Sequence, residues 1–169
     1  MELPLPEPAA QEDYWLDADQ QQDWRHLVAL IMTLPTAIES DLQRTAGLTM
    51  FEYLVLANLS EADETTLRMS DLAYKANSSL SRLSHVVSRL AKRGWVRKRP
   101  CTNDGRVSEV VLTKAGLAKV VHAAPDHARL VQELVVAPLT RPQLQALGAS
   151  AAVIVERIAQ RNNAPIGRA

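Results

Sequence analysis

Apolar residues recur at helical spacing near the start of the chain. The positions separated by three- and four-residue steps are Trp24, Leu27, Val28, Ile31, Leu34, Ile38 and Leu42, and this is the period of one face of an α-helix. Pro35 predicts a kink within this pattern, because proline cannot donate the helical backbone hydrogen bond. The spacing predicts a helix that begins near Gln20 and ends at Gly47.

A second helix is predicted to begin at Thr49. Thr49 and Glu52 have the spacing of a capping box, and the residues that follow are mostly apolar as far as Leu59. Residues 61–66 are polar and predict a loop.

Two more helices are predicted to form a helix-turn-helix. Ser70 is a suitable N-cap for a helix over residues 71–76, and the polar residues 77–79 end this helix and cap the next. A turn of about three residues is the spacing that a helix-turn-helix requires. In the second helix, one face consists of Leu80, Leu83, Val87 and Leu90. The face about 160° away consists of Arg82, His85, Arg89 and Lys92.

A β-hairpin and two further helices complete the pattern. Asn103-Asp104-Gly105 is typical of a hairpin turn, and it joins the segments WVRKRP and VSEVVLT. Thr113 then caps a helix from Lys114 that is predicted to break near Pro125 and resume to about Val136. A capping box of Thr140 and Gln143 opens the last helix, near residues 142–160.

These elements predict a winged helix-turn-helix, a mainly α fold with a small β wing. Residues 1–19 are predicted to form an acidic arm and residues 161–169 a frayed tail. The chain length of 169 residues and the apolar content of 47% suit one domain, which we expect at residues 20–160.

Charge is segregated along the chain, although its total is zero. From Arg68 to Arg106 there are ten Lys or Arg residues and two acids, a net charge of +8, whereas residues 1–23 contain seven acids and no base. No acid occurs between Ser78 and Asn103. Because an ordinary solvated helix face mixes both signs, the pattern favours a DNA-binding surface over such a face.

The second helix of the helix-turn-helix supplies most of the predicted DNA contacts. Base contacts concentrate near the N-terminus of such a helix, where the candidates are Ser81, Arg82 and His85. Ser79 and Ser84 are further candidate DNA contacts on this helix. Arg89, Lys92 and Arg93 are candidates for phosphate contacts.

The wing supplies the other predicted DNA contacts. Its candidates are Arg97, Lys98, Arg99, Asp104 and Arg106. Arg106 at the tip is suited to enter a minor groove. Asp104 either aims Arg106 through a hydrogen bond or is a simple turn residue.

These segments together resemble the MarR family of bacterial transcription regulators. The resemblance rests on LT-x-x-x-Y-x-x-L at Leu48 to Leu56, then SDLA, SRLSHVVSRLAKRGWVRKR, D-G-R at Asp104 to Arg106, and V-x-LT-x-x-G. It implies a homodimer formed through the helices at 20–47 and 114–160, with a winged helix-turn-helix at 49–113 and a wing of two or three strands. It further implies a pseudo-palindromic double-stranded DNA operator, repression in most members, and wing-tip roles for Asp104 and Arg106.

The resemblance also implies a small aromatic or lipophilic effector, bound between the dimer-forming helices and the DNA-binding region. The candidate ligand-binding residues are Trp24, His26, Met50 and Tyr53. The alternative for each is plain core packing. A repressor that such a ligand releases from DNA is the function we expect.

Two alternative functions remain open. Cys101 follows the cations Arg97, Lys98 and Arg99, which favour the thiolate form, so a redox-responsive regulator is one alternative. A winged helix used for protein contact is the other, although such a surface has no need of segregated positive charge.

Several classes of protein are not expected. The chain has no segment of the roughly 18 apolar residues that span a membrane, and its acidic start is unlike a secretory signal, so we expect a cytoplasmic protein. It has no glycine-rich phosphate loop, H-E-x-x-H or G-x-S-x-G motif. The four His residues lack metal-ligand spacing and are expected to be satisfied imidazoles. We therefore expect no enzyme activity, no metal and no cofactor.

Overall fold

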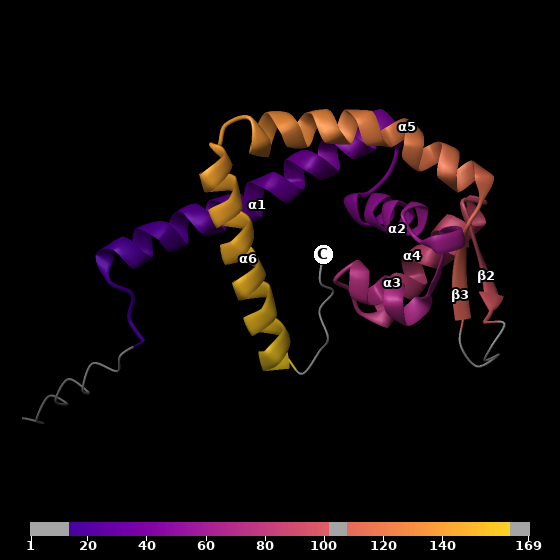
Figure 1. The fold of residues 1–169 in the computed structure, drawn as a ribbon, viewed down its shortest axis with the longest axis horizontal. Coiled ribbons are helices and arrows are strands. Elements are labelled where there is room, and N and C mark those ends of the chain that lie inside the picture. The colour runs from indigo at the N-terminus through magenta and orange to yellow at the C-terminus, as the bar shows by residue number, and fades with distance from the viewer. Residues whose placement is uncertain (1–13, 102–107, 163–169) are drawn as a thin grey trace, which may run out of the picture. The chain divides into compact units, whose positions relative to one another are not determined.

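A computed structural model describes residues 14–101 and 108–162 of the chain (Figure 1). The chain divides into two units, residues up to Ala37 and residues from Ile38 onward, which are described separately. In the described part, the structure is mainly helical with one small antiparallel sheet. This confirms the predicted fold class.

The first unit contains most of helix α1 (Ala18–Ala46), and the last turns of this helix, from Ile38 to Ala46, belong to the second unit. Asp17 caps the helix, because its carboxylate accepts a hydrogen bond from the Gln20 backbone N–H at 2.8 Å. The helix therefore begins slightly before the predicted start at Gln20. It continues through Pro35 and is followed by Gly47, where its end was predicted.

Helix α2 (Met50–Ser60) begins with the predicted capping box. The Glu52 backbone N–H donates to Thr49 Oγ1 at 3.0 Å, and the Thr49 backbone N–H donates to Glu52 Oε2 at 3.0 Å. A carboxylate of α1 adds a third contact, since the Met50 backbone N–H donates to Glu39 Oε2 at 2.6 Å. The first turn of α2 is therefore firmly held.

Helices α3 (Met69–Lys75) and α4 (Leu80–Lys92) form the helix-turn-helix. The start of α3 was predicted wrongly, because Arg68 and not Ser70 is its N-cap residue, and Arg68 makes no side-chain capping bond. The chain enters α3 directly from a strand that ends at Arg68, and this strand leaves no room for a separate cap. The turn between α3 and α4, residues 76–79, is one residue longer than predicted.

The sheet has three strands, β1 (Thr66–Arg68), β2 (Val96–Pro100) and β3 (Ser108–Leu112), in the order β1-β3-β2. Strands β2 and β3 are the predicted hairpin, and the predicted turn at residues 103–105 lies outside the described residues. The predicted loop at 61–66 instead contains a 3-10 turn, η1 (Asp63–Thr65), and the start of β1. Three residues are too few to show the alternation of a strand in sequence.

Two helices follow the sheet. Helix α5 (Lys114–Val131) begins with the predicted cap, because Thr113 Oγ1 accepts from the Gly116 backbone N–H at 3.0 Å. The predicted break near Pro125 is wrong, since α5 runs through Pro125 and leads into a π-helical turn, η2 (Gln132–Val136). One missing N–H is tolerated because the turns on either side keep their hydrogen bonds. Helix α6 (Arg141–Asn162) begins at the predicted capping box of Thr140 and Gln143.

The core lies among α2, α3, α4 and β3, and α2 also packs against α5. Its fully buried large side chains are Leu42, Leu48, Leu56, Leu59, Leu72, Leu83, Leu90, Val55, Val87 and Val110. Helix α4 buries Leu83, Val86, Val87 and Leu90, whereas Leu80, which we predicted on the same face, is 55% exposed. Leu80 is the first residue of α4 and precedes the turns that pack on the core.

Two glycines bring the end of α4, the start of β2 and the start of α5 together. Gly94 follows α4 with a φ of +74°, which a residue with a side chain adopts only with strain. A Cβ atom on Gly116 would lie 2.0 Å from the Trp95 carbonyl oxygen. The hydroxyl of Thr113 bonds the Gly94 carbonyl oxygen at 2.7 Å. This junction therefore fixes the wing relative to α4.

Candidate nucleic-acid interface

The N-terminus of α4 is set by Ser79. Its hydroxyl oxygen accepts a hydrogen bond from the Arg82 backbone N–H at 3.2 Å. Ser79, a predicted DNA contact, therefore has a structural role as the N-cap. Ser81 is exposed and Ser84 is half-buried.

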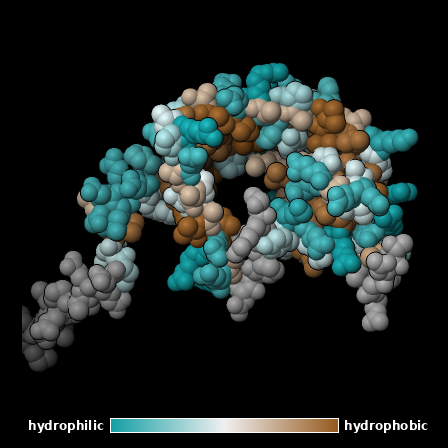
Figure 2. Space-filling view, in the orientation of Figure 1, coloured by the Kyte–Doolittle hydropathy of each residue, from teal (hydrophilic) through white to brown (hydrophobic). Residues whose placement is uncertain are grey.

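The polar face of α4 is exposed as predicted. Besides Ser81, its exposed residues are Arg82, His85, Ser88, Arg89 and Lys92. On the face of the molecule drawn in Figure 2, the surface of α3, α4 and the sheet is mainly hydrophilic. No acid interrupts this face in the sequence. The arrangement suits a helix that offers hydrogen-bond donors to the edges of bases.

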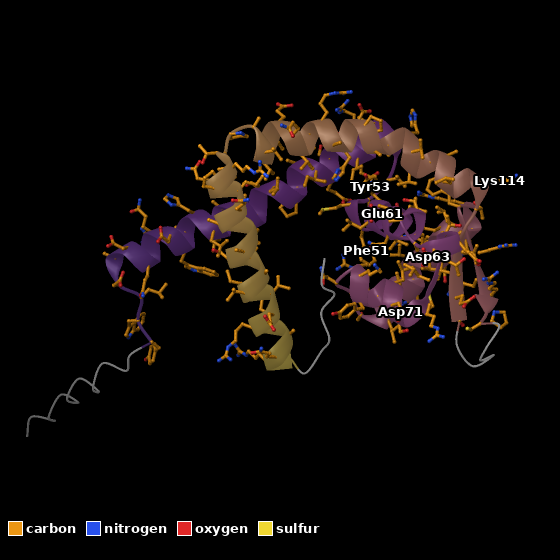
Figure 3. The ribbon with its side chains drawn as sticks, in the orientation of Figure 1. Phe51, Tyr53, Glu61, Asp63, Asp71 and Lys114 are labelled. Atoms are coloured by element: carbon orange, nitrogen blue, oxygen red, sulfur yellow. The ribbon has the colours of Figure 1, made fainter. Side chains whose placement is uncertain are left out.

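Arg82 lies against an aromatic ring of α2. Its Cζ atom is 4.4 Å from the centroid of the Phe51 ring, within the range of a cation–π interaction. Figure 3 shows Phe51 between α2 and the pair α3 and α4. Within residues 14–101 and 108–162, the Arg82 guanidinium has no hydrogen-bond acceptor and no carboxylate partner. Its N–H donors are therefore available to a ligand.

Glu52 holds the arginines at the other end of α4. Its side chain is only 3% exposed, and it lies 3.4 Å from Arg89 Nε and 3.6 Å from Arg93 Nη1. Arg93 also donates to the Gly47 carbonyl oxygen at 3.4 Å and lies over the Trp95 ring. Arg89 and Arg93, predicted to contact phosphates, are thus already paired with a carboxylate.

The sequence predicts Glu52 only as a capping residue and predicts no DNA-related role for Phe51. A capping Glu is found from its spacing to Thr49. The contacts with Arg82, Arg89 and Arg93 join positions about 30 to 40 residues apart, which a local pattern cannot reveal.

The described strands of the wing hold three of its predicted cations. Arg97 is exposed, and Lys98 Nζ donates to Ser88 Oγ of α4 at 3.4 Å. Arg99 forms an ion pair with Glu109 across the β2–β3 pair, with Nε and Oε2 2.9 Å apart. Asp104 and Arg106, the predicted wing-tip residues, lie outside the described residues.

Cys101, the residue that follows β2, is buried, with 5% of its surface exposed. Its thiol hydrogen-bonds the Glu109 carboxylate, and this bond, followed by that of Arg99, lowers the pKa of Glu109. The nearby Arg99 is engaged by the same carboxylate. Neither the burial of the thiol nor the pairing of Arg99 favours a reactive thiolate.

The four predicted ligand-binding residues lie on two helices. Trp24 and His26 are exposed on α1. On α2, Met50 is half-buried and Tyr53 is buried. The structure does not bring all four together within one described unit.

Tyr53 contacts a histidine that we predicted to be satisfied. Its ring centroid lies 4.4 Å from that of His127 on α5, and the buried Nδ1 of His127 has no hydrogen-bond partner among the described residues, which corrects the prediction. Burial lowers the pKa of His127, and the charge of Asp41 opposes this shift. Burial, aided by the charge of Glu61, raises the pKa of Tyr53. Both rings are therefore neutral at pH 7.

Two other kinds of site are absent from the described residues. No group of three or more His, Cys, Asp or Glu side chains there could hold a metal ion. No helix there is long and apolar enough to cross a membrane.

Comparison with known proteins identifies the family. The model of the MarR family matches residues 48–108. The structure is similar to that of Sco3205, a MarR family transcriptional regulator from Streptomyces coelicolor that was crystallised in complex with DNA. The two sequences are 35% identical, and the TM-score is 0.86 over 90% of this chain and 99% of that one. No curated protein matches the chain.

Two further structures extend this result. AbsC, a MarR family transcriptional regulator from Streptomyces coelicolor, is 36% identical with a TM-score of 0.82, over 86% of this chain and 98% of that one. The regulator BldR from Sulfolobus solfataricus, 20% identical with a TM-score of 0.70 over 85% and 99% of the two chains, shares the fold. Because the family model covers the helix-turn-helix and two relatives align over nearly their whole length, the chain belongs to the MarR family of transcriptional regulators, which are DNA-binding proteins and not enzymes.

Proposed function

We propose that this regulator binds a pseudo-palindromic double-stranded DNA operator as a homodimer and represses transcription in the cytoplasm. The observation that carries the proposal is the exposed, acid-free polar face of α4. The crystal structure of the relative Sco3205 in complex with DNA supports DNA as the partner.

The contacts divide into two groups. Ser81, Arg82 and His85, near the start of α4, are the base-reading residues, with Ser84 beside them. Lys92, Arg97, Lys98 and the wing-tip Arg106 contact phosphates or the minor groove, with Asp104 aiming Arg106. Arg89 and Arg99 contribute less than sequence reasoning suggests, because each already faces a carboxylate.

Apolar side chains on the terminal helices support the homodimer. Exposed examples are Trp24, Ile31 and Met32 on α1, and Val153, Ile154 and Ile158 on α6. Their surface is costly to leave in water and is suited to a second copy of the same helices. Two reading heads related by a twofold axis require an inverted repeat with half-sites about one helical turn, roughly 10 base pairs, apart.

A small aromatic or lipophilic effector is proposed to release the DNA. The unpartnered Nδ1 of His127 beside Tyr53 supports a binding site near these rings, because a polar ligand atom would complete the hydrogen bonding of the imidazole. Met50 lies in the same turn of α2 as Tyr53, and Trp24 and His26 remain candidates on α1. We expect titration with benzoate to release DNA from the wild type but not from His127→Ala, and release from both would contradict a site at these rings.

Redox control through Cys101 and a protein-binding role for the winged helix remain as alternatives. The burial of Cys101 counts against the first, and the basic face of α4 counts against the second. A protein partner would bind with little dependence on salt.

Selection from a pool of DNA duplexes with a randomised centre tests the proposal. We expect enrichment of an inverted repeat and sedimentation of the free protein as a dimer. Recovery of unrelated duplexes, or of a monomer that binds DNA, would contradict the proposal.

A further inference from the structure

We propose that Phe51 is a positioning residue that presents Arg82 to a guanine in the major groove. The inference rests on the proposed DNA-binding function and deepens it. It concerns the contact between the Phe51 ring and the Arg82 guanidinium, which joins α2 to the start of α4.

Both partners are attached to well-held backbone. Phe51 is in the first turn of α2, which the reciprocal bonds of Thr49 and Glu52 fix. Arg82 is in the first turn of α4, and its backbone N–H donates a hydrogen bond to Ser79 Oγ. The position of the guanidinium is therefore determined largely by the ring on which it lies.

The contact with the ring leaves the hydrogen-bonding capacity of Arg82 unused. A cation–π interaction engages the positive charge and not the N–H donors, and guanidinium carries five such donors in a fixed fork. Arg89, Arg93 and Arg99 each lie within 4.0 Å of a carboxylate oxygen. Arg82 has no such partner within the described residues, yet its side chain is held.

This combination matches what guanine readout requires. The O6 and N7 atoms of guanine accept two parallel hydrogen bonds from one guanidinium. A free Arg side chain loses rotamer entropy when it is fixed on a base, and a side chain already held by a ring loses less of it on binding. Phe51 thus strengthens a contact in which it takes no part itself.

A purely structural contact is the competing explanation. In that case the ring only covers the alkyl chain of Arg82, and its removal would lower the free energy of unfolding without changing base preference. Arg82 is exposed, and both explanations are compatible with this exposure. Base preference is the property that separates them.

The experiment compares the base preference of four variants with that of the wild type, on one selected duplex and on altered forms of it. Phe51→Leu removes the aromatic ring but keeps apolar bulk, and Phe51→Tyr keeps the ring. Arg82→Lys keeps the charge but loses the fork, and Lys92→Ala is a control for a phosphate contact. Affinity is measured for the duplex selected by the wild type, for the same duplex with each G·C pair exchanged in turn for A·T, and for a scrambled duplex.

We expect one G·C exchange in each half-site to weaken wild-type binding by about 10-fold or more. Phe51→Leu and Arg82→Lys should lose most of this discrimination at the same base pair, whereas Phe51→Tyr and Lys92→Ala should keep it. Affinity of Phe51→Leu for the scrambled duplex should stay near that of the wild type, which shows that the variant is folded.

Discrimination by Phe51→Leu equal to that of the wild type would overturn the inference and leave the proposed function intact. If Phe51→Leu is too unstable to measure, loss of discrimination in Phe51→Met, with Phe51→Tyr retaining it, supports the inference, and retention in Phe51→Met overturns it. A wild type that does not distinguish selected from scrambled duplexes would contradict both the function and the inference.

Discussion

Both ends of α4 carry arginine side chains, but the arginines at the two ends have different partners. At the N-terminal end, the Arg82 guanidinium lies on the Phe51 ring, and its N–H groups donate no hydrogen bond to the described residues. At the C-terminal end, Arg89 and Arg93 both face the buried carboxylate of Glu52. The net charge of the basic segment therefore overstates what this helix offers to DNA.

A physical reason for the difference lies in α2. Glu52 must be close to the Thr49 backbone to complete the capping box, and this position is buried. A buried carboxylate is costly unless cations or hydrogen-bond donors compensate it. Arg89 and Arg93 provide that compensation, whereas Arg82 meets an aromatic ring that needs none. One end of α4 thus supports the fold, and the other end is available for recognition.

The largest effect is expected from Arg82→Ala. Loss of a bidentate base contact should cost about 1–3 kcal/mol of operator affinity per half-site, with little change for a scrambled duplex. The matched Arg89→Ala should weaken operator binding less, because Arg89 is engaged by Glu52. Fluorescence anisotropy titrations at one salt concentration measure both. A larger loss of specificity in Arg89→Ala would reverse the comparison between the two ends.

The next largest effect is expected from Glu52→Gln. Glutamine retains the geometry of the capping box but removes the charge that Arg89 and Arg93 face. The two arginines are about half exposed, so we expect the free energy of unfolding to fall by only about 1 kcal/mol, measured by urea denaturation. The released cations should also make binding to any duplex steeper in salt. An unchanged salt dependence would show that Glu52 does not withhold them from DNA.

A smaller effect is expected from pH, acting through His127. Its pKa in the folded state lies below the ordinary value of 6.5 because of burial, so the unfolded chain binds the proton first as pH falls. Stability should therefore be unaffected by His127 above about pH 6.5, and it should decrease as pH falls from there toward the lower folded pKa. His127→Phe should flatten this part of the profile, and replacement of an exposed histidine, His122→Gln, is the matched control for the loss of an imidazole. A profile that His127→Phe does not alter would contradict this prediction.

The smallest effect is expected from Cys101→Ser. A serine hydroxyl can still donate to Glu109, so we expect a stability change of about 1 kcal/mol or less. Peroxide treatment should affect DNA binding of the mutant and the wild type equally. Peroxide that releases only the wild type would establish the redox alternative.

Sequence patterns predicted the parts of the fold that local rules govern. The capping residues Thr49, Thr113 and Thr140 all have the predicted bonds, and the helix-turn-helix lies where its spacing indicated. The errors occur where tertiary context decides the outcome. Strand β1 exists because it pairs with β3, and α5 passes through Pro125.

The candidate site was predictable as a surface but not as a set of partners. Periodicity separated the buried Leu83, Val87 and Leu90 from the exposed Arg82 and His85. It could not distinguish a cation available to DNA from one paired with a carboxylate, because the pairing depends on which face of α2 meets α4. Phe51 and Glu52 are adjacent in sequence, yet they have different effects on α4. The Phe51 ring contacts Arg82 without engaging its hydrogen-bond donors, whereas the Glu52 carboxylate pairs with Arg89.

The most direct test of the account is the affinity of the wild type for its selected operator and for a scrambled duplex of equal length, at two salt concentrations. We predict an operator preference of about 1000-fold or more. If a dimer neutralises roughly eight phosphates, the log–log salt slope should be near −7. Equal and weak binding to both duplexes, or a preference independent of salt, would contradict a sequence-specific DNA-binding role for α4.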